Sequence, residues 1–272
     1  MNETRLNQRP SGARKGQRIA LRATDAVWRA PVGLWARREF AVLAALALAA
    51  GAIWGFAELA DEVIEGETHA FDEAILLALR SATDRSDPLG PGWLEELMRD
   101  LTALGGVGLL TLITLAVAGF LALERKTHAA LFVLVAVGGG ILLSTLLKIG
   151  FDRPRPDLVP HGSIVYTASF PSGHAMLAAV VYLTLGALLA RVQPRRLLKL
   201  YLLGLAILLT VAVGASRVYL GVHWPTDVVA GWAVGAAWAL LCWAAALWLQ
   251  RQGRVEPSGP DPEAVAPETA DD

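Results

Sequence analysis

The stretch AALFVLVAVGGGILLSTLLKI, residues 129–149, decides the fold because it is long and apolar and carries a single charge, Lys148. A helix needs about 20 mostly apolar residues to cross the hydrocarbon of a bilayer. Five further stretches meet this requirement: 40–59, 104–123, 172–191, 197–215 and 227–249. We therefore expect an all-α, polytopic membrane protein with six transmembrane helices.

Composition points the same way. Of the 272 residues, 54% are hydrophobic and 18% are charged, and the mean hydropathy is +0.46, which is typical of a membrane protein rather than of a soluble domain. A formal net charge of -1 gives no sign of nucleic-acid binding, and we expect none. The single cysteine, Cys242, excludes an intrachain disulfide and a cysteine-based metal cluster.

The two ends of the chain differ in charge from the apolar centre. Residues 1–39 are rich in arginine, and we expect a basic cytoplasmic tail that is partly disordered or forms an amphipathic helix on anionic lipid. Residues 250–272 are rich in proline and acidic residues, so we expect a disordered acidic tail. The membrane domain then comprises residues 40–249.

The distribution of basic residues predicts the orientation of the spans. Arginines precede the first span, and arginines and lysines lie in the loops after the second and fourth spans, so these segments should face the cytoplasm. Residues 61–100 carry eleven acidic residues and three arginines, so this segment should face outward, with short interfacial helices at 71–79 and 93–101. Six spans then place both termini in the cytoplasm.

The same topology places two polar loops on one face of the membrane. Spans three and five end on the outer side and spans four and six begin there, so loops 150–171 and 216–226 should lie together. Ionisable residues are costly at a membrane boundary and usually mark a functional site. The loops and adjoining helix ends contain Lys148, Arg153, Arg155, His161, His174, Arg217, His223 and Asp227.

The cations of this set indicate an anionic ligand. Lys148, Arg155 and Arg217 can neutralise the three equatorial oxygens of a transferring phosphoryl group. Ser172 precedes the first turn of the fourth span, where its hydroxyl and the free backbone amides can bind phosphate at the positive end of the helix. Gly173 lets the ligand approach the backbone closely.

The histidines predict the chemistry. Asp227 can orient His223, which makes His223 the expected nucleophile and His174 the expected general acid and base. No cluster of Asp and His suited to a two-metal site is present in the sequence, so we expect neither a metal nor a cofactor. Arg153 and Asp152 remain open, either as residues that support the site or as residues that order the loop.

Three segments together resemble the signature of the type 2 phosphatidic acid phosphatase superfamily, which includes vanadium-dependent haloperoxidases. They are Lys148-x6-Arg155-Pro156, Pro171-Ser172-Gly173-His174 and Ser216-Arg217-x5-His223-x3-Asp227. The resemblance implies a six-helix membrane fold, a metal-independent phosphomonoesterase or pyrophosphatase activity, and the residue roles given above. The six-span arrangement is similar to that of bacterial inner-membrane phosphatases acting on undecaprenyl pyrophosphate or phosphatidylglycerophosphate, and phosphatidic acid is a further expected substrate.

Several alternatives stay open. The same intermediate could serve a lipid phosphotransferase, and the cations alone could serve a non-catalytic protein that binds or transports lipid phosphates. Gly231 and Gly235 could allow the sixth span to pack closely against another helix of the same chain, or against a second copy of the chain in a homodimer. We expect His161 to be a solvated loop residue, and Tyr166 and Phe170 to be ordinary interfacial aromatics rather than residues that line a lipid entrance.

Overall fold

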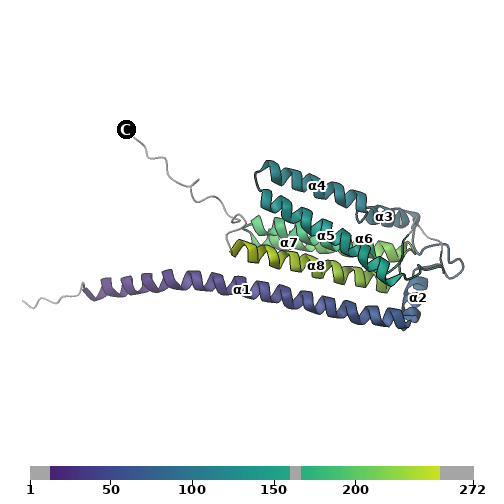
Figure 1. Cartoon of the computed structure of the whole chain (residues 1–272), viewed down its shortest axis with the longest axis horizontal. Coiled ribbons are helices and arrows are strands. Elements are labelled where there is room, and N and C mark those ends of the chain that lie inside the picture. Colours follow the sequence, from purple (N-terminus) through teal and green to yellow (C-terminus); the bar gives the residue numbers. More distant parts are fainter. Residues whose placement is uncertain (1–12, 160–166, 252–272) are drawn as a thin grey trace, which may run out of the picture. The chain divides into compact units, whose positions relative to one another are not determined.

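The computed structural model describes residues 13–159 and 167–251, and within these ranges the regular secondary structure is helical apart from an isolated bridge between Arg80 and Pro88 (Figure 1). This confirms the all-α prediction. Predictions for His161, Tyr166 and residues 1–12 and 252–272 fall outside the described residues. The helices are α1 (Ala13–Glu65), α2 (His69–Ala78), α3 (Gly92–Ala103), α4 (Val107–Leu123), α5 (Thr127–Phe151), α6 (Gly173–Val192), α7 (Arg196–Tyr219) and α8 (Pro225–Arg251).

Five of these helices are long and apolar enough to cross a membrane: residues Glu39–Glu65 of α1, and α5, α6, α7 and α8. The predicted second span, 104–123, differs from the others. The α4 helix has only 17 residues, and α3 and α4 meet the length and composition of a span only as a pair, bent by 51° at the break between them. The described residues therefore hold five candidate spans, or six if this bent pair is one span. The break includes Gly105 and Gly106, and glycine has a low helix propensity, so the chain changes direction there.

The α6 helix is the centre of the bundle. In its most apolar window, 56% of residues are buried inside the protein, compared with 11% for the span in α1. It packs most extensively against α7 and α8, as the neighbouring ribbons in Figure 1 show. A Cβ atom on Gly235 would lie 2.4 Å from the Met176 carbonyl oxygen, and one on Gly231 would lie 2.6 Å from the Ser172 carbonyl oxygen. These glycines therefore pack α8 against α6 within the chain.

The chain divides into two compact units, Met1–Ala44 and Ala45–Asp272, and the site described below lies within the second. In that unit, the C-terminal half of α1 contributes Phe56 to an aromatic cluster. Its ring lies 5.8 Å from that of Phe170, which lies 4.9 Å from the ring of Phe151. Phe170 is completely buried, so it is a core residue of the bundle rather than an exposed interfacial aromatic.

The short helices α2 and α3 lie at the same end of the bundle as the polar loops. The sequence predicts that these helices and loops share one face of the membrane. The Arg80 guanidinium, just after α2, donates a hydrogen bond to the Tyr219 carbonyl oxygen at 2.8 Å. The Tyr219 hydroxyl lies 3.0 Å from the Leu89 carbonyl oxygen. The indole N–H of Trp224 donates to the Pro154 carbonyl oxygen at 3.1 Å. The first two contacts join the connection between α2 and α3 to the end of α7, and the third joins the turn before α8 to the segment after α5.

Candidate active site

A buried histidine and carboxylate form the centre of the site. His223 lies in the turn before α8, and Asp227 lies in the first turn of α8, whose register is set by Pro225. The Nδ1 atom of His223 is 3.3 Å from Oδ2 of Asp227, and the two residues are 1% and 0% exposed. The Trp224 backbone N–H donates to the same Oδ2 at 2.9 Å, so the turn and the carboxylate hold each other in place.

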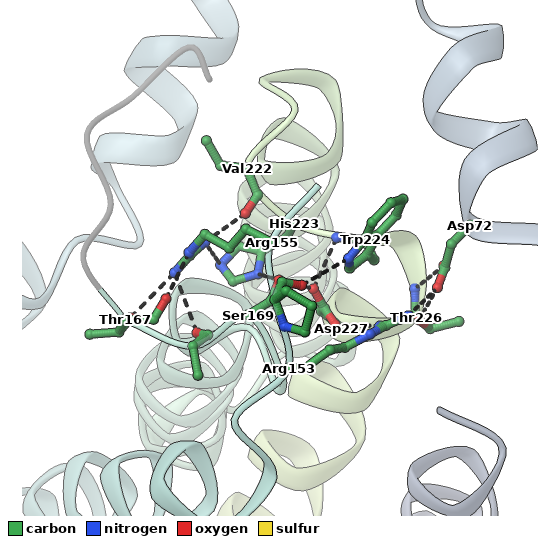
Figure 2. A network of polar contacts seen from close by, with 12 residues as sticks. Asp72, Arg153, Arg155, Thr167, Ser169, Val222, His223, Trp224, Thr226 and Asp227 are labelled. Carbon is green, nitrogen blue, oxygen red and sulfur yellow. Dashed lines mark hydrogen bonds and ion pairs between the residues drawn. The ribbon is translucent and has the colours of Figure 1, made fainter. Parts of the chain in front are cut away.

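The other ring nitrogen of His223 faces a cation. Nε2 lies 3.1 Å from Nη1 of Arg155, as Figure 2 shows. A guanidinium can only donate, so Nε2 must accept, and this geometry assigns the ring proton to Nδ1 beside Asp227. The lone pair of Nε2 therefore points toward the residues expected to hold an anion.

Arg155 and Lys148 are held by uncharged oxygen atoms. Arg155 donates to the carbonyl oxygens of Thr167 at 2.8 Å and Val222 at 2.6 Å, and Lys148 donates to the Ala168 carbonyl oxygen at 2.8 Å. Burial lowers the pKa of the Arg155 guanidinium, and the charge of Asp227 partly opposes this change. Backbone carbonyls orient these two cations without supplying a full negative charge, which suits them to bind an anion.

Arg217 is the third predicted cation and lies in the last turn of α7, 2% exposed. Its Nη1 donates to the Thr102 hydroxyl of α3 at 2.8 Å, so the bent α3–α4 pair helps to position it. His174, in the first turn of α6, lies within electrostatic reach of Arg217, His223 and Lys148. The structure thus brings the predicted cations and both histidines to one site.

The start of α6 has the features of a phosphate cradle. Ser172 is completely buried, and within the described part of the chain its hydroxyl has no hydrogen-bond partner. A Cβ atom on Gly173 would lie 3.2 Å from Cε of Lys148, so glycine permits this close approach of the lysine. The first turn of a helix also presents backbone N–H groups without intrahelical partners.

Burial changes the protonation of His223. It lowers the pKa of the ring from 6.5 to about 3, although the hydrogen bond and charge of Asp227 act in the opposite direction. Arg155 and Arg217 lower this pKa further. Near neutral pH the ring is therefore uncharged and its Nε2 lone pair is free to react.

This burial predicts how stability depends on pH. Between pH values of about 3 and 6.5, the unfolded chain binds a proton at residue 223 that the folded chain does not bind. The free energy of unfolding should therefore decrease as the pH falls below 6.5. Thermal melting in detergent can be compared at about pH 7.5 and about pH 4.5. The fall in Tm on going to the lower pH should be larger for the wild type than for His223→Gln. Equal losses would contradict the buried, neutral state of His223.

Comparison with known proteins identifies the family. Residues 129–251 match the model of the PAP2 superfamily. Over 148 residues the chain is 38% identical to phosphatidylglycerophosphatase B of Bacillus subtilis, an alignment that covers 53% of this chain and 70% of that protein. The chain belongs to the PAP2 superfamily. This PAP2 protein is also 40% identical over 108 residues to an undecaprenyl-diphosphatase of Sulfolobus acidocaldarius, covering 39% of this chain and 47% of that one.

The same family appears in solved structures. The crystal structure of a transmembrane PAP2-type phosphatidylglycerolphosphate phosphatase from Bacillus subtilis matches with a TM-score of 0.66 and 31% sequence identity. The match covers 75% of this PAP2 protein and 98% of that chain. Together with its apolar helices, this match identifies the PAP2 protein as an integral membrane protein.

The structure adds three residues that the motifs of the PAP2 protein did not indicate. Ser169 donates a hydrogen bond to Oδ2 of Asp227, and its Oγ lies 3.3 Å from Nδ1 of His223. Asp72 of α2 and Thr226 join the network on the other side of Asp227. In the sequence, the only sign of Ser169 is its position two residues before Pro171 of the Pro-Ser-Gly-His segment. Asp72 is one of eleven acidic residues in its segment, so nothing in the sequence singles it out.

The sequence contains two adjacent Arg-Pro pairs, Arg153-Pro154 and Arg155-Pro156, and the structure distinguishes them. Arg155 faces His223, whereas Arg153 forms ion pairs with Asp227 and Asp72. Arg153 therefore supports the site by holding Asp227 rather than by facing His223. This is one of the two roles that the sequence left open. The other open residue, Asp152, is exposed and adopts a left-handed conformation that ends α5.

Proposed function

We propose that the chain is a metal-independent membrane phosphatase that hydrolyses a lipid phosphate or pyrophosphate through a phosphohistidine on His223. The observation that carries this proposal is the orientation of His223. Its Nδ1 faces Asp227 and its Nε2 faces Arg155. A protein that only binds phosphate needs the cations, but it does not need a buried histidine whose lone pair is aimed at the anion site.

In the first step, the Nε2 lone pair of His223 attacks phosphorus and the bond from phosphorus to the lipid oxygen breaks. His174 donates its proton to the departing oxygen, so His174 must enter this step protonated. Lys148, Arg155 and Arg217 stabilise the negative charge on the equatorial oxygens, together with the Ser172 hydroxyl and the backbone at Gly173. Asp227 stabilises the positive charge that the imidazole ring acquires.

In the second step, water replaces the lipid oxygen. His174, now neutral, removes a proton from the attacking water as the water oxygen bonds to phosphorus. The bond between phosphorus and Nε2 breaks, the electron pair returns to His223, and inorganic phosphate leaves. Both steps use the chain's own acid and base groups and need no metal.

The proposed substrate class rests on the names of the relatives and on the location of the protein in a membrane. Two relatives are named for phosphatidylglycerophosphate and undecaprenyl diphosphate, which share a phosphate on a membrane-anchored lipid. The distribution of lysines and arginines supports an outward-facing site in a cell membrane with both chain ends in the cytoplasm. We place the reaction at the outer, periplasmic surface of a bacterial inner membrane, with the lipid tail remaining in the bilayer.

The purified chain in detergent should release inorganic phosphate from lipid phosphates in the presence of EDTA, without any added acceptor. Phosphatidylglycerophosphate, undecaprenyl pyrophosphate, phosphatidic acid and a soluble sugar phosphate form a suitable panel. A complete loss of activity in EDTA would contradict a metal-free reaction. Release that requires an added alcohol would favour the phosphotransferase, and saturable binding without turnover would favour a binding or transport protein.

A further inference from the structure

Asp72 is a carboxylate in an unusual position. It lies on α2, a short helix outside the spans, yet its side chain is completely buried. Oδ1 accepts a hydrogen bond from the Thr226 backbone N–H at 2.9 Å, and Oδ2 accepts one from the Thr226 hydroxyl at 2.6 Å. Asp72 thus caps the first turn of α8 from a different helix, one residue before Asp227.

Arg153 connects this carboxylate to Asp227. Its Nη2 lies 2.8 Å from Oδ2 of Asp72, and its Nη1 lies 2.6 Å from Oδ1 of Asp227. The Arg153 side chain is 12% exposed and also lies over the ring of Trp224, 5.6 Å from its centroid. Figure 2 shows the resulting row, in which Arg153 lies between the two carboxylates and His223 lies beyond Asp227.

The charges in this row determine what Asp227 can do. Asp72, Arg153 and Asp227 together carry a net charge of -1 in their usual ionised forms. Without Asp72, Arg153 would neutralise Asp227 and the net charge would be zero. Electrostatic interactions between buried groups are strong, so this difference in net charge should change the electrostatic potential at His223, whose Nδ1 faces Oδ2 of Asp227.

We propose that Asp72 is a positioning residue for the reaction, acting through Arg153 to orient Asp227 and to preserve the negative charge that Asp227 presents to His223. This inference rests on the proposed function, because the charge matters when phosphoryl transfer makes the His223 ring cationic. The Asp72 carboxylate offsets the charge of Arg153, so Asp227 retains its full effect on the ring. Asp72 touches neither the substrate nor the reacting atoms, so its loss should affect turnover more than substrate binding.

A charge-balance cycle tests this proposal. Asp72→Asn keeps an oxygen for the Thr226 N–H but removes the negative charge, and Arg153→Gln removes the positive charge. Each single variant should lower kcat by about 10- to 100-fold with KM changed by less than about twofold, the size of effect typical of residues that support a reactive group. The double variant restores the net charge of -1, so its kcat should be higher than that of either single variant.

Glu73→Gln is the matched control because Glu73 is the neighbour of Asp72 on α2 and its replacement removes the same charge. Its kcat should stay within about twofold of the wild type. Arg153→Lys keeps the charge balance and should retain more activity than Arg153→Gln, which provides a second test should Asp72→Asn fail to fold. Melting temperatures in detergent report folding for every variant.

Two results would overturn the proposal. One is a kcat for Asp72→Asn equal to that of the wild type. The other is a double variant with a kcat no higher than that of the poorer single variant, because a purely structural contact has no reason to be rescued by charge. Failure of the proposed function is a separate outcome, since the wild type would then release no phosphate from any lipid in the panel.

Discussion

His223→Ala should lower the rate of phosphate release from every lipid phosphate by at least about 10⁴-fold, as expected when the nucleophile of a coupled catalytic group is removed. The ring supplies the Nε2 lone pair that faces Arg155, and alanine offers no substitute. Water could still attack directly, but it would lack an oriented nucleophile. Phosphate release measured with purified protein in detergent gives the comparison.

Two controls make this result specific. His128→Ala replaces an exposed histidine at the start of α5 and should leave the rate unchanged. His223→Ala itself should remain monodisperse and show a cooperative thermal transition. Turnover near that of the wild type in folded His223→Ala would refute the assignment of the nucleophile.

Asp227→Asn should lower kcat by about 10³-fold, comparable in kind to the loss seen when the carboxylate of a His-Asp pair becomes an amide. The carboxylate accepts hydrogen bonds from Arg153, Ser169 and the Trp224 N–H while it faces Nδ1 of His223. An amide has only one accepting oxygen, so it cannot satisfy all of these donors. It also favours the tautomer with the proton on Nε2, the atom that must attack.

The measurement is kcat and KM on the best lipid of the panel. Asp152→Asn is the matched control because Asp152 is an exposed carboxylate at the end of α5. It should keep kcat within about twofold of the wild type, as surface substitutions generally do. A kcat for Asp227→Asn as high as that of the Asp152→Asn control would show that the His223–Asp227 pair does not serve catalysis.

Most of the fold could be predicted because a bilayer imposes a minimum length on apolar segments. The predicted span at 129–149 lies within α5, and the spans at 197–215 and 227–249 lie within α7 and α8. The second span was harder to place. Hydropathy does not report direction, so the 51° bend between α3 and α4 near Gly105 was not visible in the apolar pattern.

The part of the site that could be predicted consists of residues at the fixed spacings of a known motif. Lys148, Arg155, His174, Arg217 and His223 come from three separate segments, yet the predicted topology places them on one face and the structure brings them together. The supporting residues depend on distant contacts instead. The Asp72–Arg153 ion pair joins residues 81 positions apart, and no local pattern encodes such a pairing.

The central claim is a covalent phosphohistidine on His223, and the most direct test is to trap it. The wild type would be mixed with a lipid labelled with ³²P at the terminal phosphate, quenched rapidly in alkaline detergent and digested for peptide mapping. We predict an acid-labile, alkali-stable label on the peptide that contains His223, and no label in His223→Ala. Label on His174, or steady turnover with no labelled protein at any quench time, would contradict this account.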